Sequence, residues 1–463
     1  MSKQAAIDLL KQAYQFFHIG DISEYLKRLD EAKKILDTEK DCGTVYGEWV
    51  LVSSFCYITD INMLCAKFKE AAKYINGYSC VLPLHAQLFD EYYNPFAVIN
   101  KMPGHTGENA DKLTEAVSCF YRLTGGGKGT DLCYRAQLAH YRGEIEASKS
   151  LAMEAFEAAQ ANSQELIALC AAETLAQIAK HMSDEKLWRY SYGYIVGVSG
   201  GLRPASENCR KQAEAVLSIL SLSLGVLKTL PKWIENDDYG AISAPWGYRI
   251  IGNKIGYGVL SNAYIAQLEY YSYKGEPVKA LNIADKLQKI YGIDNLLTNA
   301  YLEFLRAGCF LQLGSLDEVK NALARGIKII EADGLYLIAA EFEPAFGELL
   351  HEAAIKTNPE TLPEINAIGK NFWSKLSAFR EEIIKNSPQG FTKREAQIAP
   401  LIAAGKTTAE IAEALFISEH TAKHHISNIL DKLNVSRRTQ VTEALSSFQS
   451  VKAAHWTEKR GSK

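Results

Sequence analysis

The chain has 463 residues, 47% of them hydrophobic and 23% charged, and its formal net charge is −3. This length predicts two or three domains, and the composition is that of a folded soluble protein, which excludes a chain without packed cores. No apolar run approaches the ~18 residues that a membrane-spanning helix needs, and the N-terminus lacks the apolar core of a signal peptide. We therefore expect a cytoplasmic protein that makes no membrane contact.

The cysteines support that location. Their number is odd, no Cys-x-x-Cys occurs, and none lies in the C-terminal part of the chain. This usage is typical of buried thiols in a reducing cytosol rather than of a disulfide framework or a zinc site. The nine are Cys42, Cys56, Cys65, Cys80, Cys119, Cys133, Cys170, Cys209 and Cys309.

Taken in chain order, most of the first 380 residues predict helical hairpins. Four stretches place a glycine, which permits a tight turn, between two expected helices: Gly20, Gly143, Gly275 and Gly314. Aromatic or long apolar residues precede each glycine. Twelve positions after it, three of the four copies carry a small residue that would let the two helices pack closely. These later positions hold Ala32, Ala155, Leu287 and Gly326.

The hairpin pattern resembles tetratricopeptide repeats in a slightly lengthened form. Gly275 and Gly314 are 39 residues apart, and no copy carries every residue of the repeat signature. The resemblance implies an α-solenoid with a concave inner face. An irregular helical bundle is the alternative interpretation.

Three stretches break the hairpin pattern: 88–112, 187–206 and 230–252. The first is loop-like, and the other two are rich in aromatic residues. Long insertions in a repeat array are often functional, and Tyr and Trp with nearby Arg suit an organic ligand that carries an anionic group. Core packing between hairpins is the alternative. The residues of this ligand hypothesis are Trp188, Arg189, Tyr190, Tyr192, Tyr194, Trp233, Tyr239, Trp246, Tyr248 and Arg249.

No motif in the chain indicates catalysis or a cofactor. The stretch "LTGGGKGT" (123–130) has the wrong spacing for a phosphate-binding loop and follows no strand pattern, so we expect a flexible interhelical loop there. No HExxH motif occurs. We therefore expect a protein that is not an enzyme.

The helical region ends in a short linker at 386–390, where Pro and Gly stop a helix. We predict a repeat domain at 1–385, a small helical domain at 391–450 and a polar tail at 451–463. From Phe391 to Lys463 there are 11 Lys and Arg against 7 Asp and Glu, a net charge of +4, which leaves 40 against 47 for the rest of the chain. Nucleic acid would therefore be bound by the C-terminal part.

Four short helices are predicted in the C-terminal part. Thr392 with Glu395 predicts a capping box, Gly405 ends the first helix, and Thr407 or Thr408 caps the second. Ser418 caps a third helix at 419–433. One apolar stripe runs along this third helix, at Ala422, Ile426, Ile429, Leu430 and Leu433.

The polar side of helix 419–433 admits two interpretations. His420 and His424 have the i, i+4 spacing of metal ligands, but no further ligand is placed beside them, so we expect no metal site. Two short helices joined by a tight turn, the second basic toward its start, are instead typical of a helix that enters the major groove of DNA. The residues predicted to bind DNA are Thr408, His420, Thr421, Lys423, His424, Ser427, Asn428, Arg437 and Arg438.

The C-terminal domain also resembles the LuxR-type (LuxR/FixJ) helix-turn-helix family. The matching positions are Arg394-Glu395, Gly405, Glu410-Ile411-Ala412, Ile417-Ser418, Thr421, Lys423, His425, Asn428-Ile429, Lys432-Leu433, Val435 and Arg438. Ala422 and Asn434 depart from the usual Val and Gly, and His424 occupies a variable position. The resemblance implies a transcription regulator that binds double-stranded DNA as a homodimer, with RNA polymerase as a further candidate partner.

A tetratricopeptide-like array followed by this domain is similar to the C-terminal half of maltose-regulator-like (MalT-like) activators. Those activators carry a nucleotide-binding domain, but no such motif occurs here, so we expect no cofactor. The main hypothesis is a regulator whose helical repeats bind a small-molecule or peptide inducer. The alternative is a helical-repeat scaffold whose C-terminal domain does not bind DNA.

Overall fold

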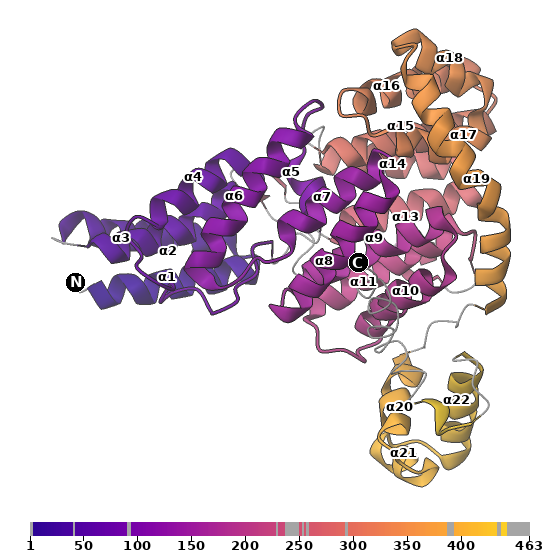
Figure 1. Ribbon diagram of the computed structural model, residues 1–463. Helices are drawn as coiled ribbons and strands as arrows, with labels where there is room; N and C mark the ends of the chain where they lie inside the picture. Colours follow the sequence, from indigo (N-terminus) through magenta and orange to yellow (C-terminus); the bar gives the residue numbers. More distant parts are fainter. Residues whose placement is uncertain are drawn as a thin grey trace, which may run out of the picture. The chain divides into compact units, whose positions relative to one another are not determined.

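The computed structural model describes residues 3–39, 42–89, 94–227, 230–236, 250–251, 254–255, 259–291, 295–386, 393–432 and 437–441. These residues are almost entirely helical (Figure 1). The sheet structure among them is a two-residue antiparallel ladder, in which β1 (Ile250–Ile251) pairs with β2 (Lys254–Ile255). The predicted all-α class, with tetratricopeptide-like hairpins followed by a helix-turn-helix domain, is confirmed. No described helix combines the length and the apolar character that crossing a bilayer requires.

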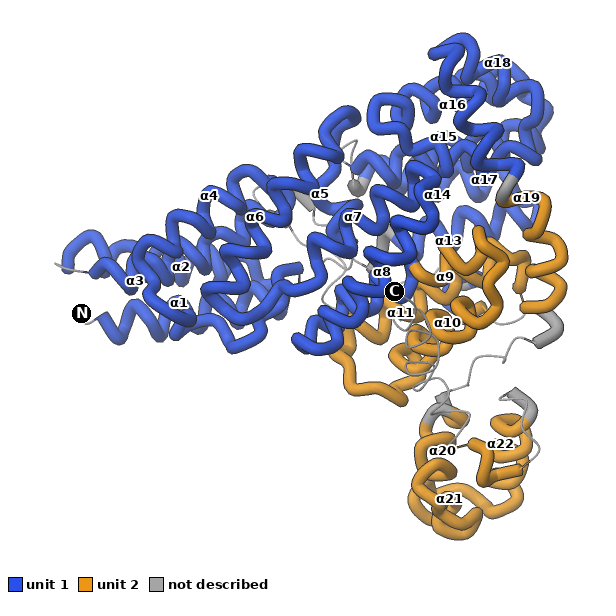
Figure 2. The backbone as a smooth tube through the Cα atoms, in the orientation of Figure 1, with its two compact units in different colours: residues 1–174, 232–371 blue, residues 175–231, 372–463 orange. Residues whose placement is uncertain are grey.

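Two compact units divide the chain (Figure 2). Unit 1 combines residues 1–174 and 232–371, and unit 2 combines residues 175–231 and 372–463. Two helices, α9 (Glu165–Met182) and α19 (Thr361–Asn386), begin in unit 1 and end in unit 2. Each unit therefore joins segments far apart in the sequence, and the domain limits expected from the sequence stay a prediction.

The other elements follow in chain order. Unit 1 contains α1 (Lys3–His18), α2 (Ile22–Thr38), α3 (Gly43–Ser53), η1 (Ser54–Tyr57), α4 (Ile61–Ala71), α5 (Pro95–Ile99), α6 (Thr106–Thr124), α7 (Thr130–Tyr141), α8 (Ile145–Ala161), α12 (Trp233–Asn236), β1, β2, α13 (Val259–Tyr273), α14 (Pro277–Tyr291), α15 (Leu296–Gln312), α16 (Leu316–Glu331), α17 (Tyr336–Phe346) and α18 (Glu348–Thr357). Unit 2 contains α10 (Glu185–Ser199), α11 (Glu207–Ser223), α20 (Lys393–Ala403), α21 (Thr408–Ala414) and α22 (Glu419–Lys432).

The four glycines expected at hairpin turns do occupy such turns. Gly20, Gly143, Gly275 and Gly314 join α1 to α2, α7 to α8, α13 to α14 and α15 to α16, and in each pair the helices pack together. Their φ angles lie between +72° and +82°, in the left-handed region that glycine enters without steric cost. The sequence therefore located these turns correctly.

The second helix of each hairpin packs closely through the position twelve residues after its glycine. Ala32, Ala155 and Leu287 have no exposed surface, and Gly326 is buried in α16. A Cβ atom at Gly326 would lie 3.1 Å from the ring of Phe304 on α15. This contact supports the expected role of a small residue at this position.

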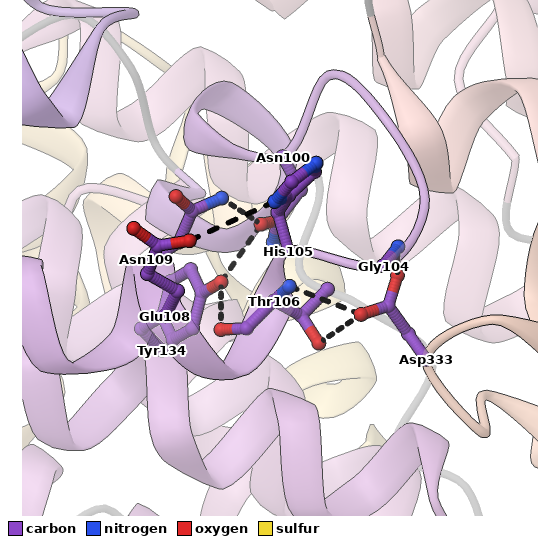
Figure 3. A network of polar contacts seen from close by, with 8 residues as sticks. All are labelled: Asn100, Gly104, His105, Thr106, Glu108, Asn109, Tyr134 and Asp333. Atoms are coloured by element: carbon purple, nitrogen blue, oxygen red, sulfur yellow. Dashed lines mark hydrogen bonds and ion pairs between the residues drawn. The ribbon is translucent and has the colours of Figure 1, made fainter.

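One buried carboxylate links two segments of unit 1 that lie far apart in the sequence (Figure 3). Asp333, in the turn between α16 and α17, is 6% exposed. Its side chain accepts hydrogen bonds from the amide of Gly104 at 2.6 Å and from the amide and hydroxyl of Thr106 at 3.0 and 2.7 Å. We call Asp333 with these two partners the Asp333 clasp.

A second polar link lies beside the clasp. The fully buried Asn100 accepts hydrogen bonds at its side-chain oxygen from Asn109 at 2.9 Å and from Tyr134 at 2.8 Å (Figure 3). Its backbone oxygen accepts the amide of Leu296, at the start of α15. Helix α5 accordingly packs against α15, and α7 packs against α17. The early and late hairpins of unit 1 are thus in direct contact, which the repeat pattern alone did not predict.

All three expected breaks in the helical pattern contain helix among the described residues, and the stretch 230–252 contains α12. Residues 185–199 form the regular helix α10, because Trp188, Tyr192 and Ile195 repeat at helical spacing and are buried together. The interior glycine Gly197 leaves room for the side chain of Arg203, which would lie 3.2 Å from a Cβ there. The stretch 88–112 likewise contains α5 and the start of α6.

The glycine-rich stretch 123–130 is an interhelical loop, as expected, and its centre is buried. A Cβ at Gly126 would lie 1.9 Å from the backbone oxygen of Ala86. The amide of Gly127 donates to the side-chain oxygen of Gln164 at 2.9 Å. These glycines allow the loop to pack closely against neighbouring backbone and side chains.

Candidate nucleic-acid interface

Local backbone and side-chain interactions set where the helices α20, α21 and α22 begin and end. Gly405, at φ +77°, ends the first helix. Thr407 and Glu410 form a reciprocal capping box at the start of α21. The hydroxyl of Ser418 accepts the amide of Thr421 at 3.1 Å and so caps α22. The two caps on α21 and α22 follow the prediction, whereas Thr392 lies outside the described residues.

One face of α22 is buried against the two preceding helices. Ala422, Ile426 and Ile429 of α22 are each at most 8% exposed. They share a hydrophobic core with residues of α20, of α21 and of the segment after α22, namely Ile398, Ala399, Ile402, Ile411, Ala412 and Val441. This core fixes the rotation of α22 about its own axis.

The opposite face of α22 carries polar side chains in solvent. His420, Lys423, His424 and Ser427 are all exposed. At about 100° per residue these four fall within roughly 100° of one another around the helix axis. The structure thus places four of the predicted residues on one continuous surface, which we call the polar face of α22.

Thr421 and Asn428 flank this face and are half-buried. The hydroxyls of Thr421 and Ser418 lie 2.8 Å apart, and the side-chain amide of Asn428 lies 3.3 Å from Nδ1 of His424. These contacts hold the flanking side chains and the His424 ring in place. A pre-arranged set of donors loses less conformational entropy when it binds a large ligand.

The two arginines after α22 differ in their surroundings. Arg437 is exposed, whereas Arg438 is half-buried and donates to the hydroxyl of Thr408 at 3.3 Å and to the backbone oxygen of Lys406. Arg438 thereby ties the segment after α22 to the start of α21. The sequence indicated a DNA contact for Thr408 and Arg438 but gave no sign of this internal link.

Two further residues of the domain were given no role from the sequence, although Arg394 was among the positions that match the family. The guanidinium of Arg394 donates to the backbone oxygen of Leu415 and joins α20 to the end of α21. Phe416, in the turn between α21 and α22, is 96% exposed and has a φ of +53°. In the sequence, Phe416 could have been noticed as an aromatic residue within a three-residue turn.

The start of α21 has a favourable charge arrangement. The backbone amide of Thr407 donates to the Glu410 carboxylate, and this bond, the Thr407 hydroxyl and Lys406 hold the pKa of Glu410 below its ordinary value. A carboxylate in the first turn also complements the helix dipole. Glu410 is therefore part of the capping structure rather than of the polar face.

The aromatic residues of the ligand hypothesis occupy different environments. Trp188 and Tyr192 stack with ring centroids 5.2 Å apart, and Phe379 meets Trp188 edge-on at 5.8 Å. The Arg203 guanidinium lies 4.7 Å from the ring centre of Tyr194. Trp188, Tyr192 and Tyr194 are each at most 8% exposed, as core residues of unit 2 would be.

The other members of that hypothesis that the structure describes have different surroundings. Arg189 is exposed and pairs with Glu185 on its own helix, and Tyr190 is half-buried. Trp233 is buried in unit 1. Tyr239, Trp246, Tyr248 and Arg249 lie outside the described residues. Ligand binding by this set stays a prediction.

A short turn between two helices, a shared core and an outward polar face define a helix-turn-helix domain. The family model described as "Bacterial regulatory proteins, luxR family" matches residues 389–445. The spore germination protein GerE of Bacillus subtilis is 50% identical over 54 residues, which cover 12% of this chain and 73% of that protein. The chain belongs to the LuxR family of bacterial regulatory proteins.

Longer relatives match over a smaller share of their length. The transcriptional regulatory protein LiaR of Bacillus subtilis is 42% identical over 113 residues, which cover 24% of this chain and 51% of LiaR. The chain spans about half or less of the length of the first curated relatives that it matches. A solved structure of a Rap protein complexed with Competence and Sporulation Factor aligns over 83% of this chain and 99% of that one, at 11% identity and a TM-score of 0.39. A TM-score of this size does not establish a shared fold.

Proposed function

We propose that the chain is a cytoplasmic DNA-binding transcription regulator, in which α22 enters the major groove of DNA and the helical hairpins bind a controlling ligand. The polar face of α22 carries this proposal. It is exposed, it lies opposite the buried stripe, and a major groove admits one helix of this size. Membership of the LuxR family supports the same assignment.

Different side chains of this interface would contact different parts of the DNA. Lys423 and His424, near the start of the polar face, would reach base edges, with His420 and Ser427 beside them. Thr421, Asn428 and Arg437 would contact phosphates and so position the helix without selecting a sequence. Thr408 and Arg438 would lie at the border of the interface, since they bond to each other.

A single helix-turn-helix unit buries little surface on DNA, so a specific site requires two copies about one helical turn apart. We therefore propose a homodimer, and RNA polymerase as a further partner at promoters. Light scattering of the full chain at micromolar concentration measures the assembly directly. A strict monomer that binds specific DNA tightly at physiological salt would contradict the dimer.

The main test uses duplex DNA selected from a random library by the full chain. Replacing Lys423 by Ala should weaken binding to the selected duplex by about 1–3 kcal/mol. A control is Lys34→Ala, which removes another exposed lysine, on α2, and should leave binding unchanged. Failure to enrich any duplex would replace this proposal with the scaffold hypothesis.

A second variant separates phosphate contacts from base contacts. Arg437→Ala should weaken binding to selected and unselected duplexes alike and should lower the slope of affinity against salt by about one ion. Arg437 suits this test better than Arg438, because Arg438 also holds α21 in place. Sequence-dependent losses in Arg437→Ala would contradict the division of roles.

A further inference from the structure

The turns of two late hairpins in unit 1 lie next to each other. Gly275 joins α13 to α14 and Gly314 joins α15 to α16, and α15 packs on both α13 and α14. The side-chain amide of Gln312, the last residue of α15, donates to the backbone oxygen of Ser272 at 3.0 Å. Ser272 and Gln312 stand three and two residues before their glycines, so this bond holds the two turns together.

Large apolar side chains are exposed at both of these turns. Each of the four is between 45% and 60% exposed, and each hairpin supplies two of them. We call these residues the hairpin-tip patch: Tyr273, Val278, Leu313 and Leu316. Single exposed apolar residues are common on soluble proteins, whereas several on adjoining turns are typical of a surface that another molecule covers.

The two turns of the patch are open, unlike the corresponding turn between α7 and α8. A Cβ atom at Gly143, in the α7–α8 turn, would lie 2.7 Å from the side chain of Ile368, so α19 covers that turn. A Cβ atom at Gly275 or at Gly314 would meet no atom of the described residues within 4 Å. The hairpin-tip patch is therefore accessible to a partner.

The charges beside the patch differ in sign between the two hairpins. Residues 273–279 contain two Lys and one Glu, a net charge of +1, whereas residues 313–319 contain one Asp, one Glu and no basic residue, a net charge of −2. Lys274, Asp317 and Glu318 are all exposed. The two acidic residues also complement the dipole of α16, in whose first turn they lie. The patch thus has a basic side and an acidic side.

We infer that the hairpin-tip patch binds the same patch on a second copy of this chain. In a two-fold symmetric contact, each hairpin of one copy can face the other hairpin of its partner. The basic α13–α14 turn would then lie against the acidic α15–α16 turn twice, with the apolar side chains of both copies buried between them. An apolar centre with a polar and charged border is typical of protein interfaces.

This inference rests on the proposed homodimer and assigns a surface to it. The patch belongs to unit 1, whereas the polar face of α22 belongs to unit 2. Contacts made by unit 1 would keep two copies together whether or not DNA is bound. Once one α22 is bound, the second would then be present at a high effective concentration, which raises the affinity for two half-sites without changing the affinity for one.

Sedimentation velocity of the full chain without DNA, over a concentration series, measures the dissociation constant of the dimer. Leu316→Glu and Val278→Glu each place two carboxylates in the interface, one from each copy, and should each raise this constant at least ~10-fold. The control is Leu26→Glu, which puts the same charge at another exposed apolar residue, on α2, and should leave the constant unchanged.

The charged border is tested with a second pair of variants. Glu318→Lys brings the net charge of residues 313–319 from −2 to zero and should weaken the dimer about 3–10-fold, because each border contact contributes little but occurs twice. Glu348→Lys makes the same change in total charge at a side chain on α18 that is 92% exposed, and it should have no effect. Circular dichroism melting shows whether each variant is folded, and the two apolar positions belong to different hairpins, so one remains decisive if the other unfolds.

Three results would overturn the inference. These are a wild-type chain that stays monomeric at micromolar concentration, a dimer that both Leu316→Glu and Val278→Glu leave intact, and equal dissociation constants for Glu318→Lys and Glu348→Lys. DNA binding is measured on the same samples. Intact patch variants of a chain that still selects a duplex would remove this inference alone, whereas a dimer broken by these variants in a chain that selects no duplex would remove the proposed DNA binding alone.

Discussion

The polar face of α22 and the Asp333 clasp are both built from polar groups, but they are assembled in different ways. The first comes from a single helix and depends on spacings of three and four residues. The second joins the loop before α6 to the turn before α17 and depends on hydrogen bonds between residues 227 and 229 positions apart. A surface whose residues recur at helical spacing can be predicted from the sequence, whereas one that is assembled by tertiary packing cannot. Four changes in the chain test this difference.

The largest effect is expected from Asp333→Ala. The change leaves the Gly104 amide and the buried amide and hydroxyl of Thr106 without an acceptor and should lower the local stability of unit 1 by about 4 kcal/mol. Hydrogen exchange of the full chain should show lost protection at the starts of α6 and α17. Because α22 is built locally, its protection should not change.

The exposed Asp317 on α16 provides the matched control for the clasp. Asp317→Ala removes the same side chain without breaking a buried bond and should leave protection in α6 unchanged. Equal loss of protection in both variants, or a loss in α22, would show that the two regions are not independent.

The reverse experiment is Ile429→Ala in the core beneath α22. Ile429 has no exposed surface, so its truncation should cost about 3 kcal/mol through lost burial and a cavity. Protection should fall in α20, α21 and α22, and the clasp in unit 1 should be unaffected. Ser427→Ala, on the exposed side of the same helix, is the control and should change protection little.

A smaller effect is expected from Thr407→Ala. Loss of the capping box at the start of α21 should cost about 1 kcal/mol, seen as faster exchange of the first amides of that helix. Thr407→Ser keeps the hydroxyl and should retain most of the protection. If Ser and Ala behave alike, the cap does not contribute to stability.

The smallest effect concerns pH. The pKa of Glu410 is held below its ordinary value of 4.5, chiefly by the Thr407 amide, so its ionised form stabilises the folded state. This contribution is present above pH 4.5 and should be lost as the pH falls below it. Melting curves of the wild type should therefore lose more stability across this range than those of Glu410→Gln. Parallel curves would contradict the role of Glu410.

The sequence allowed the local features to be predicted well. Gly20, Gly143, Gly275 and Gly314 marked real turns because a left-handed residue is needed there, and Thr407 and Ser418 were correctly placed as caps. The apolar stripe on α22 identified the buried side of that helix and hence the exposed one. Each of these features is decided within a few residues of the chain.

Features decided by tertiary packing could not be predicted in this way. Residues 187–199 looked irregular because of their glycines, yet burial of Trp188 and Tyr192 makes them a helix. Arg438 looked like a phosphate contact, and its bonds to Thr408 and Lys406 depend on how the helices fold back. Nothing near Asp333 in the sequence indicates its partners, since they are 227 and 229 residues away.

That separation also affects how the protein is made. Synthesis proceeds at about 5–20 residues per second, so Thr106 emerges roughly 10–45 seconds before Asp333 is added to the chain. During this interval the first hairpins can form, but the amides of Gly104 and Thr106 must stay hydrated or bind another group. The loop before α6 is therefore the part of unit 1 that reaches its final structure late, and the growing chain is most exposed to proteases and chaperones there.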